Sequence, residues 1–152
     1  MFDKPAQPAI VANVIYADPD AAMAWLECAF GFEPRLVIRD RDGLMHYSEL
    51  HLGDGHISVG REWDARTKSP RSTGGAYTMA LTVTLSGDLD AHCARARAAG
   101  AVIEREPADQ FYGERTYCAL DFEGHFWTFA AKVADVPLSE VANERGLIVQ
   151  QR

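Results

Sequence analysis

Several features that would indicate other classes of protein are absent or scarce in this sequence. Lys and Arg number 15 against 22 Asp and Glu, and the formal net charge at pH 7 is −7. Nucleic acid and anionic membrane surfaces attract basic patches, so we expect neither as a partner. No apolar run approaches the roughly 20 residues of a membrane-spanning helix. Residues 1–5 also lack the apolar core of a secretory signal.

Cysteine is scarce as well. The sequence has only Cys28, Cys93 and Cys118, and none of them has the CxxC spacing of a metal or redox motif. An odd number of cysteines in a chain without a secretory signal indicates reduced thiols, so we expect a cytoplasmic protein. The sequence also contains no P-loop, GxGxxG or HExxH motif. The usual signatures of nucleotide binding, dinucleotide binding and zinc-protease chemistry are therefore missing.

What the sequence does contain is an internal repeat. An apolar-periodic stretch at 18–31 begins with Asp-Pro-Asp and ends in Gly, and a similar stretch at 88–100 begins with Asp-Leu-Asp and ends in Gly. Strand-like segments follow each stretch and lead to a Gly-His step, at 55–56 in the first copy and at 124–125 in the second. A repeat offset of about 70 residues is typical of two supersecondary modules within one domain.

Hydrophobic periodicity predicts a β-α-β-β-β order in each copy, and therefore an α+β fold of two tandem βαβββ modules. The predicted strands are 9–16, 34–39, 45–52 and 56–60 in the first copy and 76–85, 101–105, 115–121 and 125–131 in the second, with helices after Asp18 or Asp20 as far as Gly31 and at 88–99. We expect residues 1–152 to form a single domain that consists of module one (9–60), a polar linker (61–75), module two (76–131) and a C-terminal tail (132–152). The tail has one helix candidate, 139–145, and is expected to pack on the body or on a partner chain.

Alternation along the predicted strands separates an apolar face from a face of hydroxyls and small side chains. Leu50, Leu52, Ile57 and Val59 share one side of the hairpin in module one, whereas its other side is polar. The apolar side must bury the helix of its module, because burial of apolar area drives folding. The polar side carries too few Lys and Arg residues for an ordinary solvated sheet face, so we predict that it lines a concave cavity.

The residues in this order resemble the vicinal oxygen chelate superfamily, which includes glyoxalase I, extradiol dioxygenases and bleomycin-resistance proteins. Residues 18–32 look like its first helix signature, and 43–55 (GLMHYSELHLGDG) are similar to the run G-x-x-x-H-A-E-L…G-D-G of the bleomycin-resistance-like or PhnB-like branch. Residues 112–127 resemble the branch's run G-D/E-R…D-P-x-G-H-x-W, except that Phe122 stands where proline is usual. The resemblance spans 9–131 and implies the glyoxalase/bleomycin resistance/dioxygenase-like fold with a concave mixed sheet.

The resemblance also implies where a metal would lie. Metal enzymes of the superfamily hold a divalent ion through His or Gln, Glu, His and Glu, one from each of four strands. By strand position these slots fall near Val11, Ser58, Ala80 and Thr128, or at Asn13 and Thr82 if the first and third shift by two residues. A divalent ion of this kind needs strong nitrogen or oxygen ligands, and none of these six residues supplies one. We therefore expect no metal and no other cofactor.

Glu49 is the strongest candidate for ligand recognition or chemistry. Alternation places it on the polar side of the hairpin together with His51 and His56. On an otherwise neutral wall, burial would raise the pKa of this carboxyl group, and it would act as a general base or bind a cationic ligand. The alternative is a structural ion pair with Arg39 or Arg115. The two histidines adjoin an exposed turn, so we expect surface positions rather than a metal site.

The residues expected to contact a ligand are Tyr47, Glu49, Ser58, Trp63, Thr82, Tyr112, Cys118 and Thr128. Trp63 and Tyr112 lie on predicted loops, where they would stack on a flat ligand or contact another subunit. Cys118 has no histidine within reach to activate it, so no residue is assigned a catalytic role.

Three functions are compatible with these residues. The first is a metal-free protein that sequesters a toxic or antibiotic-like small molecule in a cavity between the sheets. The second is a metal-dependent lyase, isomerase or dioxygenase, and the third is an acid–base enzyme that uses Glu49 with Tyr47 or His51. The resemblance further implies a homodimer, with the modules paired within one chain or exchanged between two.

Overall fold

The computed structural model describes residues 8–152, which form two equivalent halves and a C-terminal extension. The strands are β1 (Ala12–Tyr16), β2 (Glu33–Arg39), β3 (Met45–Leu52), β4 (Gly55–Arg61), β5 (Ala80–Thr84), β6 (Val102–Asp109), β7 (Glu114–Leu120) and β8 (Phe126–Lys132). The helices are α1 (Pro19–Phe30), α2 (Leu89–Ala98) and α3 (Leu138–Asn143), with a 3-10 turn at Pro70–Thr73 in the linker.

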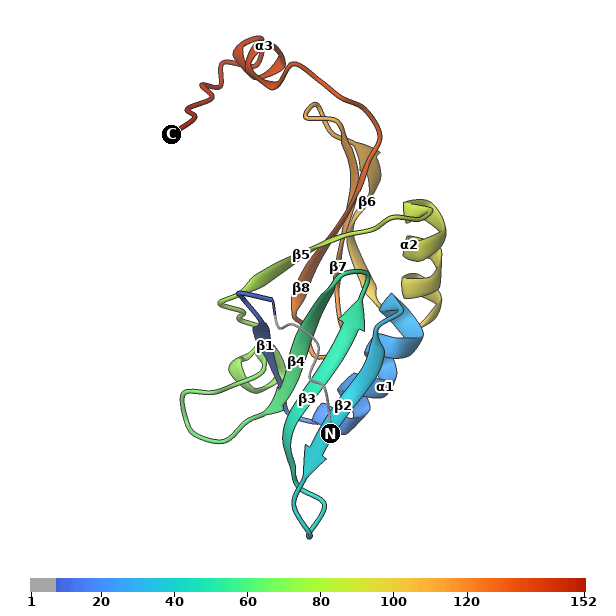
Figure 1. The fold of residues 1–152 in the computed structure, drawn as a ribbon, viewed down its shortest axis with the longest axis vertical. Coiled ribbons are helices and arrows are strands. Elements are labelled where there is room, and N and C mark those ends of the chain that lie inside the picture. The colour runs from blue at the N-terminus through green and yellow to red at the C-terminus, as the bar shows by residue number, and fades with distance from the viewer. Residues whose placement is uncertain (1–7) are drawn as a thin grey trace.

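Both halves have the same mixed sheet. The strand orders are β1-β4-β3-β2 and β5-β8-β7-β6. The first strand of each half pairs in parallel with the last, and the other neighbours are antiparallel. α1 and α2 lie side by side and cover the same side of the two sheets (Figure 1). The predicted α+β fold of two βαβββ modules is confirmed.

The ends of α1 follow the signals in its sequence. The Asp18 carboxylate accepts a hydrogen bond from the backbone N–H of Ala21, and Pro19 occupies the first turn. Gly31 ends the helix with a φ of 80°, in the left-handed region that favours glycine. In the second half, Asp88 caps α2 in the same way through the N–H of Ala91.

The strand predicted at 76–85 is shorter than expected, because β5 begins only at Ala80. Its partner β8 begins at Phe126, directly after a tight turn, and the two strands pair from Ala80 opposite Phe126 onward. Residues 76–79 therefore have no neighbouring strand and belong to the linker region. For the same reason β1 spans only five of the residues predicted at 9–16, since its pairing with β4 begins at Ala12.

The two halves share one apolar core. Phe30 from the end of α1 contacts Trp127 and Phe129 of β8, with ring centroids 5.4 and 4.7 Å apart. All three rings are buried, together with aliphatic residues from both halves. The indole N–H of Trp25 donates a hydrogen bond to the carbonyl oxygen of Ala99 at 2.8 Å, which links α1 to the end of α2. Each half therefore buries part of its apolar surface on the other.

The turn between β7 and β8 provides a second link between the halves. Asp121 accepts hydrogen bonds from the Tyr16 hydroxyl at 2.6 Å and from the Trp127 indole N–H at 3.0 Å. Glu123, in the same turn, accepts from the backbone N–H groups of Ala17 and Asp18 at the start of α1. Both carboxylates are buried. This turn therefore supplies acceptors to the buried Tyr16 hydroxyl and to two backbone N–H groups at the start of α1, all in the first half.

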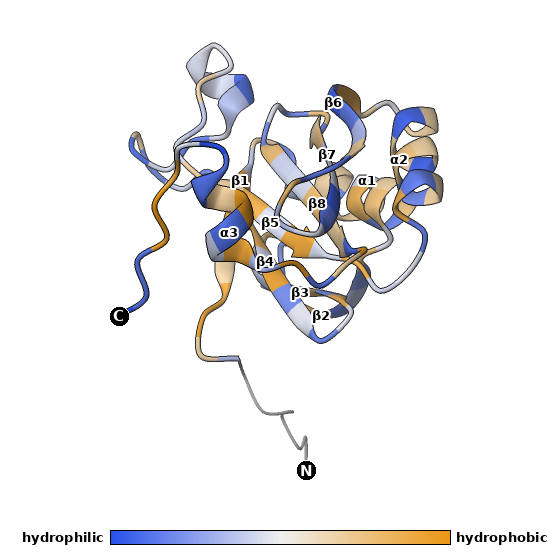
Figure 2. Ribbon diagram, turned by 90° about the horizontal axis from the view of Figure 1, so that it is seen from above, coloured by the Kyte–Doolittle hydropathy of each residue, from blue (hydrophilic) through white to orange (hydrophobic). Residues whose placement is uncertain are grey.

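The C-terminal extension forms an arm that leaves the body after β8 and carries α3 at its far end (Figure 1). Viewed from above, α3 and the C-terminus lie on the side of the sheets opposite α1 and α2 (Figure 2). The predicted tail helix is confirmed, although it is shorter than expected and ends at Asn143. No helix in residues 8–152 is both long and apolar enough to cross a membrane.

Candidate functional site

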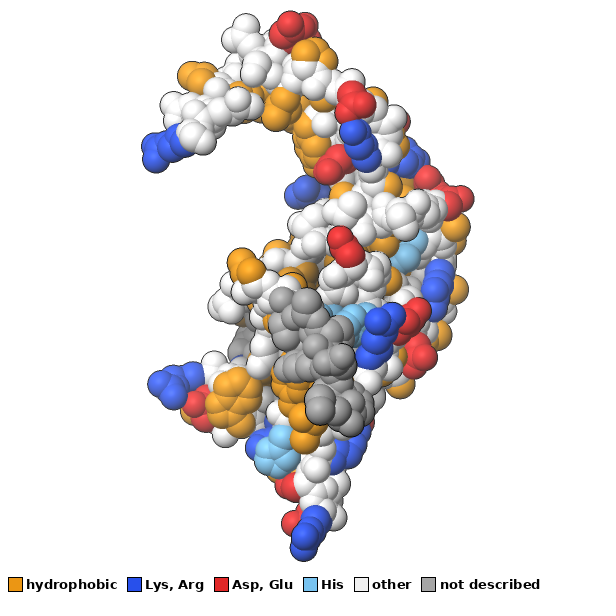
Figure 3. Space-filling model, viewed as in Figure 1, with side chains coloured by type: hydrophobic (Ala, Val, Ile, Leu, Met, Phe, Trp, Pro, Cys, Tyr) orange, Lys and Arg blue, Asp and Glu red, His pale blue; other side chains and the backbone are white. Residues whose placement is uncertain are grey.

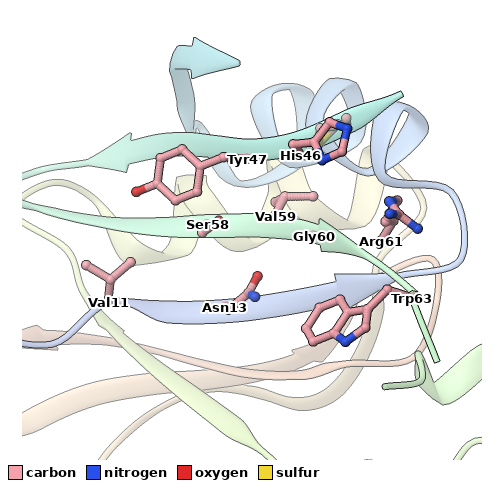
Figure 4. Close-up of a pocket in the computed structure, with 10 residues that line it drawn as sticks. Val11, Asn13, His46, Tyr47, Ser58, Val59, Gly60, Arg61 and Trp63 are labelled. Atoms are coloured by element: carbon pink, nitrogen blue, oxygen red, sulfur yellow. The ribbon is translucent and has the colours of Figure 1, made fainter. Parts of the chain in front are cut away.

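A cavity of about 380 Å³ opens on the side of the first sheet that faces away from the helices. Its lining residues come from β1, β3 and β4 and from the chain just after β4: Val11, Asn13, Met45, His46, Tyr47, Ser58, Val59, Gly60, Arg61 and Trp63. Figure 4 shows the side chains of Asn13, Tyr47 and Ser58 around its floor, with Trp63 at one edge. This cavity thus belongs to the first sheet and the chain just after it, whereas a second cavity of about 360 Å³, lined by residues of both halves, lies between the sheets, where the sequence predicts one.

A local separation of β3 and β4 explains this position. In the second half β7 and β8 pair along their whole lengths, but β3 and β4 pair only from Leu50 opposite Ile57 to the hairpin end. Beyond that point the Ser48 hydroxyl bridges the two strands. It donates to the Val59 carbonyl oxygen at 2.8 Å and accepts from the Val59 N–H at 2.9 Å. The residues next to this bridge, among them Tyr47, Ser58 and Val59, line the cavity.

The floor of the cavity is polar and closely packed. Asn13 on β1 lies opposite Ser58 on β4 in the parallel ladder. The Asn13 side chain also packs against Gly60, where an added Cβ would lie 2.8 Å from its amide oxygen. A side chain larger than hydrogen at position 60 would therefore displace Asn13. The amide and the Ser58 hydroxyl give the floor both hydrogen-bond donors and acceptors.

Tyr47 connects the cavity to Glu49, which is only 4% exposed. The Tyr47 hydroxyl donates a hydrogen bond to Glu49 Oε1 at 3.0 Å. Burial and this hydrogen bond to a carboxylate raise the pKa of the Tyr47 phenol, so it stays protonated at neutral pH. His51 Nε2 lies 3.6 Å from Glu49 Oε2, and the His51 ring stacks on that of His56 with centroids 4.7 Å apart.

The edge of the cavity combines a flat ring with a cation. Trp63 is 56% exposed, so a face of its indole is open to a ligand. Arg61 lies at the same end and forms no ion pair with any residue in the part of the chain that the structure describes. His46, also at the edge, contacts Asp40 at 3.0 Å, and this contact lowers the pKa of the Asp40 carboxyl. Of these groups, Trp63 and Arg61 are the ones available to a ligand.

The other residues predicted to contact a ligand lie elsewhere. Thr82 lines a second cavity of about 360 Å³, at the seam where β1 and β4 approach β5. Cys118 and Thr128 lie opposite each other on β7 and β8, with Sγ 3.6 Å from Oγ1. Tyr112 is on the β6–β7 turn and packs edge-on against Phe111. The structure thus brings Tyr47, Ser58 and Trp63 into one cavity, with Glu49 directly behind Tyr47.

The ion pairs suggested for Glu49 are wrong, because both arginines have other partners. Arg39 binds Asp20 at the start of α1 and the carbonyl oxygen of Gly43. Arg115 binds Asp90 of α2 and Asp109 of β6, at 2.8 and 2.9 Å. Arg115 therefore points toward the helix side of its sheet and not toward the polar face. Neither guanidinium takes part in the candidate site.

The register of the strands defines the positions at which a metal would be held. Asn13 faces Ser58 across β1 and β4, and Thr82 faces Thr128 across β5 and β8, whereas Ala80 faces Phe126. One amide and three hydroxyls make a weak donor set for a divalent ion. Among residues 8–152, no cluster of three or more His, Cys, Asp or Glu residues has a geometry that would hold a metal. The residues present at these positions do not fit the superfamily's metal centre.

Sequence reasoning missed part of the cavity. The sequence predicts Arg61 in the linker, but Arg61 is the last residue of β4 and lies at the cavity edge. From the sequence, His46 is recognised only as part of a motif, and no role is predicted for Gly60. Continuing the alternation of β4 by one residue would have found Gly60. No pattern in the sequence reveals that β3 and β4 separate at Ser48.

Two mixed sheets of βαβββ topology, with both helices on one side and a cavity on the other, define a protein of the vicinal oxygen chelate type. The chain belongs to the Glyoxalase/Bleomycin resistance protein/Dioxygenase superfamily, whose sequence model matches residues 9–129. The recognition made from the sequence motifs is thereby confirmed.

Several proteins are similar to this chain in structure or in sequence. TioX from Micromonospora sp. ML1 is 34% identical, with a TM-score of 0.67, and the match covers 83% of this chain and 99% of TioX. A superfamily enzyme from Burkholderia phytofirmans PsJN is 18% identical, with a TM-score of 0.61 and coverage of 81% and 97%, which shows likeness of fold alone. An uncharacterized protein of Mycobacterium bovis is 27% identical over 140 residues, which cover 89% of this chain and 90% of the relative.

Proposed function

We propose that this protein binds a small, flat, partly aromatic molecule in the cavity of module one and sequesters it without a metal ion. One observation supports the proposal: Asn13 lies opposite Ser58 and Thr82 opposite Thr128, and neither these residues nor the alternatives Val11 and Ala80 at the positions that the resemblance assigns to a metal are strong metal ligands. An amide and hydroxyls suit hydrogen bonding to an organic ligand far better than binding a divalent cation.

The edge of the cavity supports a flat ligand with an acceptor group. The exposed indole of Trp63 offers a stacking face, and the guanidinium of Arg61 binds an anionic or carbonyl group of the same molecule. On the floor, Asn13 and Ser58 fix the orientation of the ligand through hydrogen bonds. Pockets that combine apolar area with a few placed polar groups are typical of small-molecule sites.

Metal analysis of the protein as isolated, combined with native mass spectrometry, tests the metal-free part of the proposal. We expect substoichiometric amounts of every transition metal, and a mass that equals that of the chain or of the chain with an organic ligand. Zinc, iron, manganese or nickel bound at one equivalent per chain would contradict the proposal and favour a metal-dependent enzyme.

The cavity itself can be tested with 8-anilinonaphthalene-1-sulfonate, a flat probe that carries an anionic group. Trp63→Ala is expected to weaken binding about tenfold or more, because the stacking face is lost. Arg61→Gln should weaken binding of the sulfonate about threefold to tenfold. Tyr112→Ala is the matched control, since Tyr112 is also an exposed loop aromatic but lies in the other half. Equal losses in Trp63→Ala and Tyr112→Ala would contradict this location.

A second candidate, an acid–base enzyme, is favoured by the hydrogen bond from Tyr47 to Glu49 beside the cavity. This pair would place a carboxylate base next to a protonated phenol. Glu49→Gln distinguishes the two functions. A sequestering protein is expected to keep binding within a few-fold of the native affinity, whereas an enzyme would retain binding and lose turnover of its ligand. Mass spectrometry of the ligand after incubation with native protein measures that turnover.

A further inference from the structure

A groove adjoins the cavity of module one along β1, and we call it the linker groove. It has a volume of about 340 Å³, and its apolar wall consists of Ile15, Pro70, Tyr77 and Met79. Because β1 is the edge strand of its sheet, the groove lies between this edge and residues 66–79. Figure 3 shows apolar surface beside charged side chains where the linker loop protrudes at the lower left. The linker thus borders the cavity at its start and the groove further along.

Asn13 belongs to the wall of both the cavity and the linker groove. Val11 and Asn13 line the cavity, whereas Asn13 and Ile15 line the groove, so successive residues on one face of β1 lead from one to the other. The side-chain amide of Asn13 forms no hydrogen bond with any residue from 8 to 152. Its donors and its acceptor are therefore open to a ligand at the point where the cavity and the groove meet.

Tyr77 gives the groove a stacking surface, as Trp63 does in the cavity. Its ring stacks on that of Phe126, with centroids 5.6 Å apart and planes 18° apart. The Tyr77 side chain is nevertheless 46% exposed, and Met79, also in the groove wall, is 37% exposed. The ring is therefore held in one orientation while part of its surface remains free for a flat group.

The linker segment that forms the groove wall is anchored to the body. The Ser69 hydroxyl donates to Glu123 of the β7–β8 turn at 2.5 Å, and the Ser69 N–H donates to Glu62 at 2.9 Å. The Thr73 hydroxyl donates to the carbonyl oxygen of Ala76 at 2.7 Å. Ser69 and Glu123 are both buried. The groove is therefore formed before a ligand binds, which limits the entropy lost on binding.

The charged side chains that border the groove already have partners. Arg66 pairs with Asp64 at 3.0 Å, and Lys68 pairs with Glu62 at 3.2 Å. Both ring nitrogens of His125 contact oxygen atoms of the protein. The free surface of the groove is mainly apolar, so it suits an uncharged group.

We propose that the cavity and the linker groove form one extended site for an elongated molecule, in which a polar link such as an amide joins two flat, apolar arms. This inference rests on the proposed function and adds the shape of the ligand to it. One arm lies against Trp63 and the other against Tyr77, and Asn13 binds the link because its amide can both donate and accept. Binding of the first arm holds the second at a high effective concentration, so the joined molecule binds more tightly than one arm alone.

Fluorescence titration with two uncharged dansyl probes tests this shape. Didansylcadaverine has two dansyl rings joined through sulfonamides by a short alkyl chain, whereas N-butyl dansylamide has a single ring. We expect the two-ring probe to displace 8-anilinonaphthalene-1-sulfonate from the cavity and to bind about tenfold or more tightly than the single-ring probe. An affinity ratio below about threefold in the native protein would overturn the proposal.

Tyr77→Ala locates the second arm. It should reduce the affinity ratio of the two dansyl probes to less than about threefold, while the affinity for the anilinonaphthalene sulfonate stays within about twofold of the native value. Met79→Glu leaves the contact between Tyr77 and Phe126 in place and should have the same effect, because it puts a charge into the apolar groove. Tyr112→Ala is the matched control, since Tyr112 is a tyrosine of similar exposure, 41%, on the β6–β7 turn.

The variants also separate this proposal from the proposed function. If Trp63→Ala weakens binding of the sulfonate but Tyr77→Ala and Met79→Glu leave the affinity ratio intact, the cavity binds a ligand and the extended site is refuted. If Trp63→Ala leaves binding of the sulfonate unchanged, the proposed function fails and the extended site fails with it.

Discussion

Asp121 shows how much of the junction between the halves depends on one side chain. Its carboxylate accepts hydrogen bonds from the Tyr16 hydroxyl, the Trp127 indole and two backbone N–H groups of its own turn. Burial alone would raise the pKa of this carboxyl, but the hydrogen bonds and the neighbouring His125 outweigh burial and lower it. The ionised form is therefore the one that the folded state selects.

Asp121→Asn is expected to lower the free energy of unfolding by about 2–4 kcal/mol at neutral pH, because buried donors lose a charged acceptor. A folded-state pKa below its ordinary value contributes stability above that value, and the contribution is lost as pH falls through the lowered pKa. The difference between native protein and variant should therefore stay constant above about pH 5 and shrink as the pH falls below about 4. Urea denaturation at several pH values measures it.

Asp42→Asn, at an exposed turn residue, is the control and should change the unfolding free energy little across the same range. A difference between native protein and Asp121→Asn that stays constant with pH would show that the Asp121 carboxylate is not the titrating group.

At the scale of elements, the two halves differ most in the pairing of their third and fourth strands. β7 and β8 form an uninterrupted ladder, whereas Ser48 interrupts the ladder between β3 and β4. The candidate cavity lies beside this interruption. Where the ladder stops, a small hydroxyl residue thus satisfies the backbone groups of Val59 that would otherwise be left without partners.

Ser48→Ala should lower the free energy of unfolding by about 1–3 kcal/mol, because the Val59 N–H and carbonyl would lose their buried partner. Ligand binding in the cavity should weaken at the same time, since β4 would move. Ser58→Ala is the matched control for stability, because its hydroxyl bridges no strands. Thermal unfolding and probe titration measure the two effects, and equal stability losses in both variants would contradict this role of Ser48.

Many elements follow from local patterns, and these could be predicted from the sequence. Asp18, Asp88 and Gly31 mark helix ends by chemistry that acts within a few residues, and alternation assigns the faces of the strands. The location of the cavity could not be predicted in this way. It depends on how Ser48 meets Val59 across two strands, and a serine in a strand gives no signal of such a bridge. The partners of Arg39 and Arg115 were missed because both arginines reach residues on helices.

At the scale of the whole molecule, the halves are joined by buried contacts on several sides. Phe30 at the end of α1 packs on aromatic rings of β8, and the β7–β8 turn binds the start of α1. Each half would expose apolar surface if it separated from the other. We therefore expect the two halves to unfold together.

Phe30→Ala should lower the free energy of unfolding by about 3–5 kcal/mol, the usual cost of emptying a buried aromatic site. Tryptophan fluorescence, which includes Trp127 at the junction, and circular dichroism should shift to the same new midpoint in urea. Val37→Ala, at a partly exposed residue of β2, is the control and should change little. Separate transitions by the two methods would show that the halves are independent.

The unequal halves also suggest how a duplicated chain can acquire a new role. After duplication, one copy can keep all of its strand pairing and stabilise the fold. The sequence of the other copy can then change. A mutation that parted two strands in this other copy would weaken only local pairing, because the shared interior would still hold both copies together. In this protein the regular copy is the second and the divergent copy is the first. Searches for altered ligand preference by directed evolution should accordingly concentrate on the first copy.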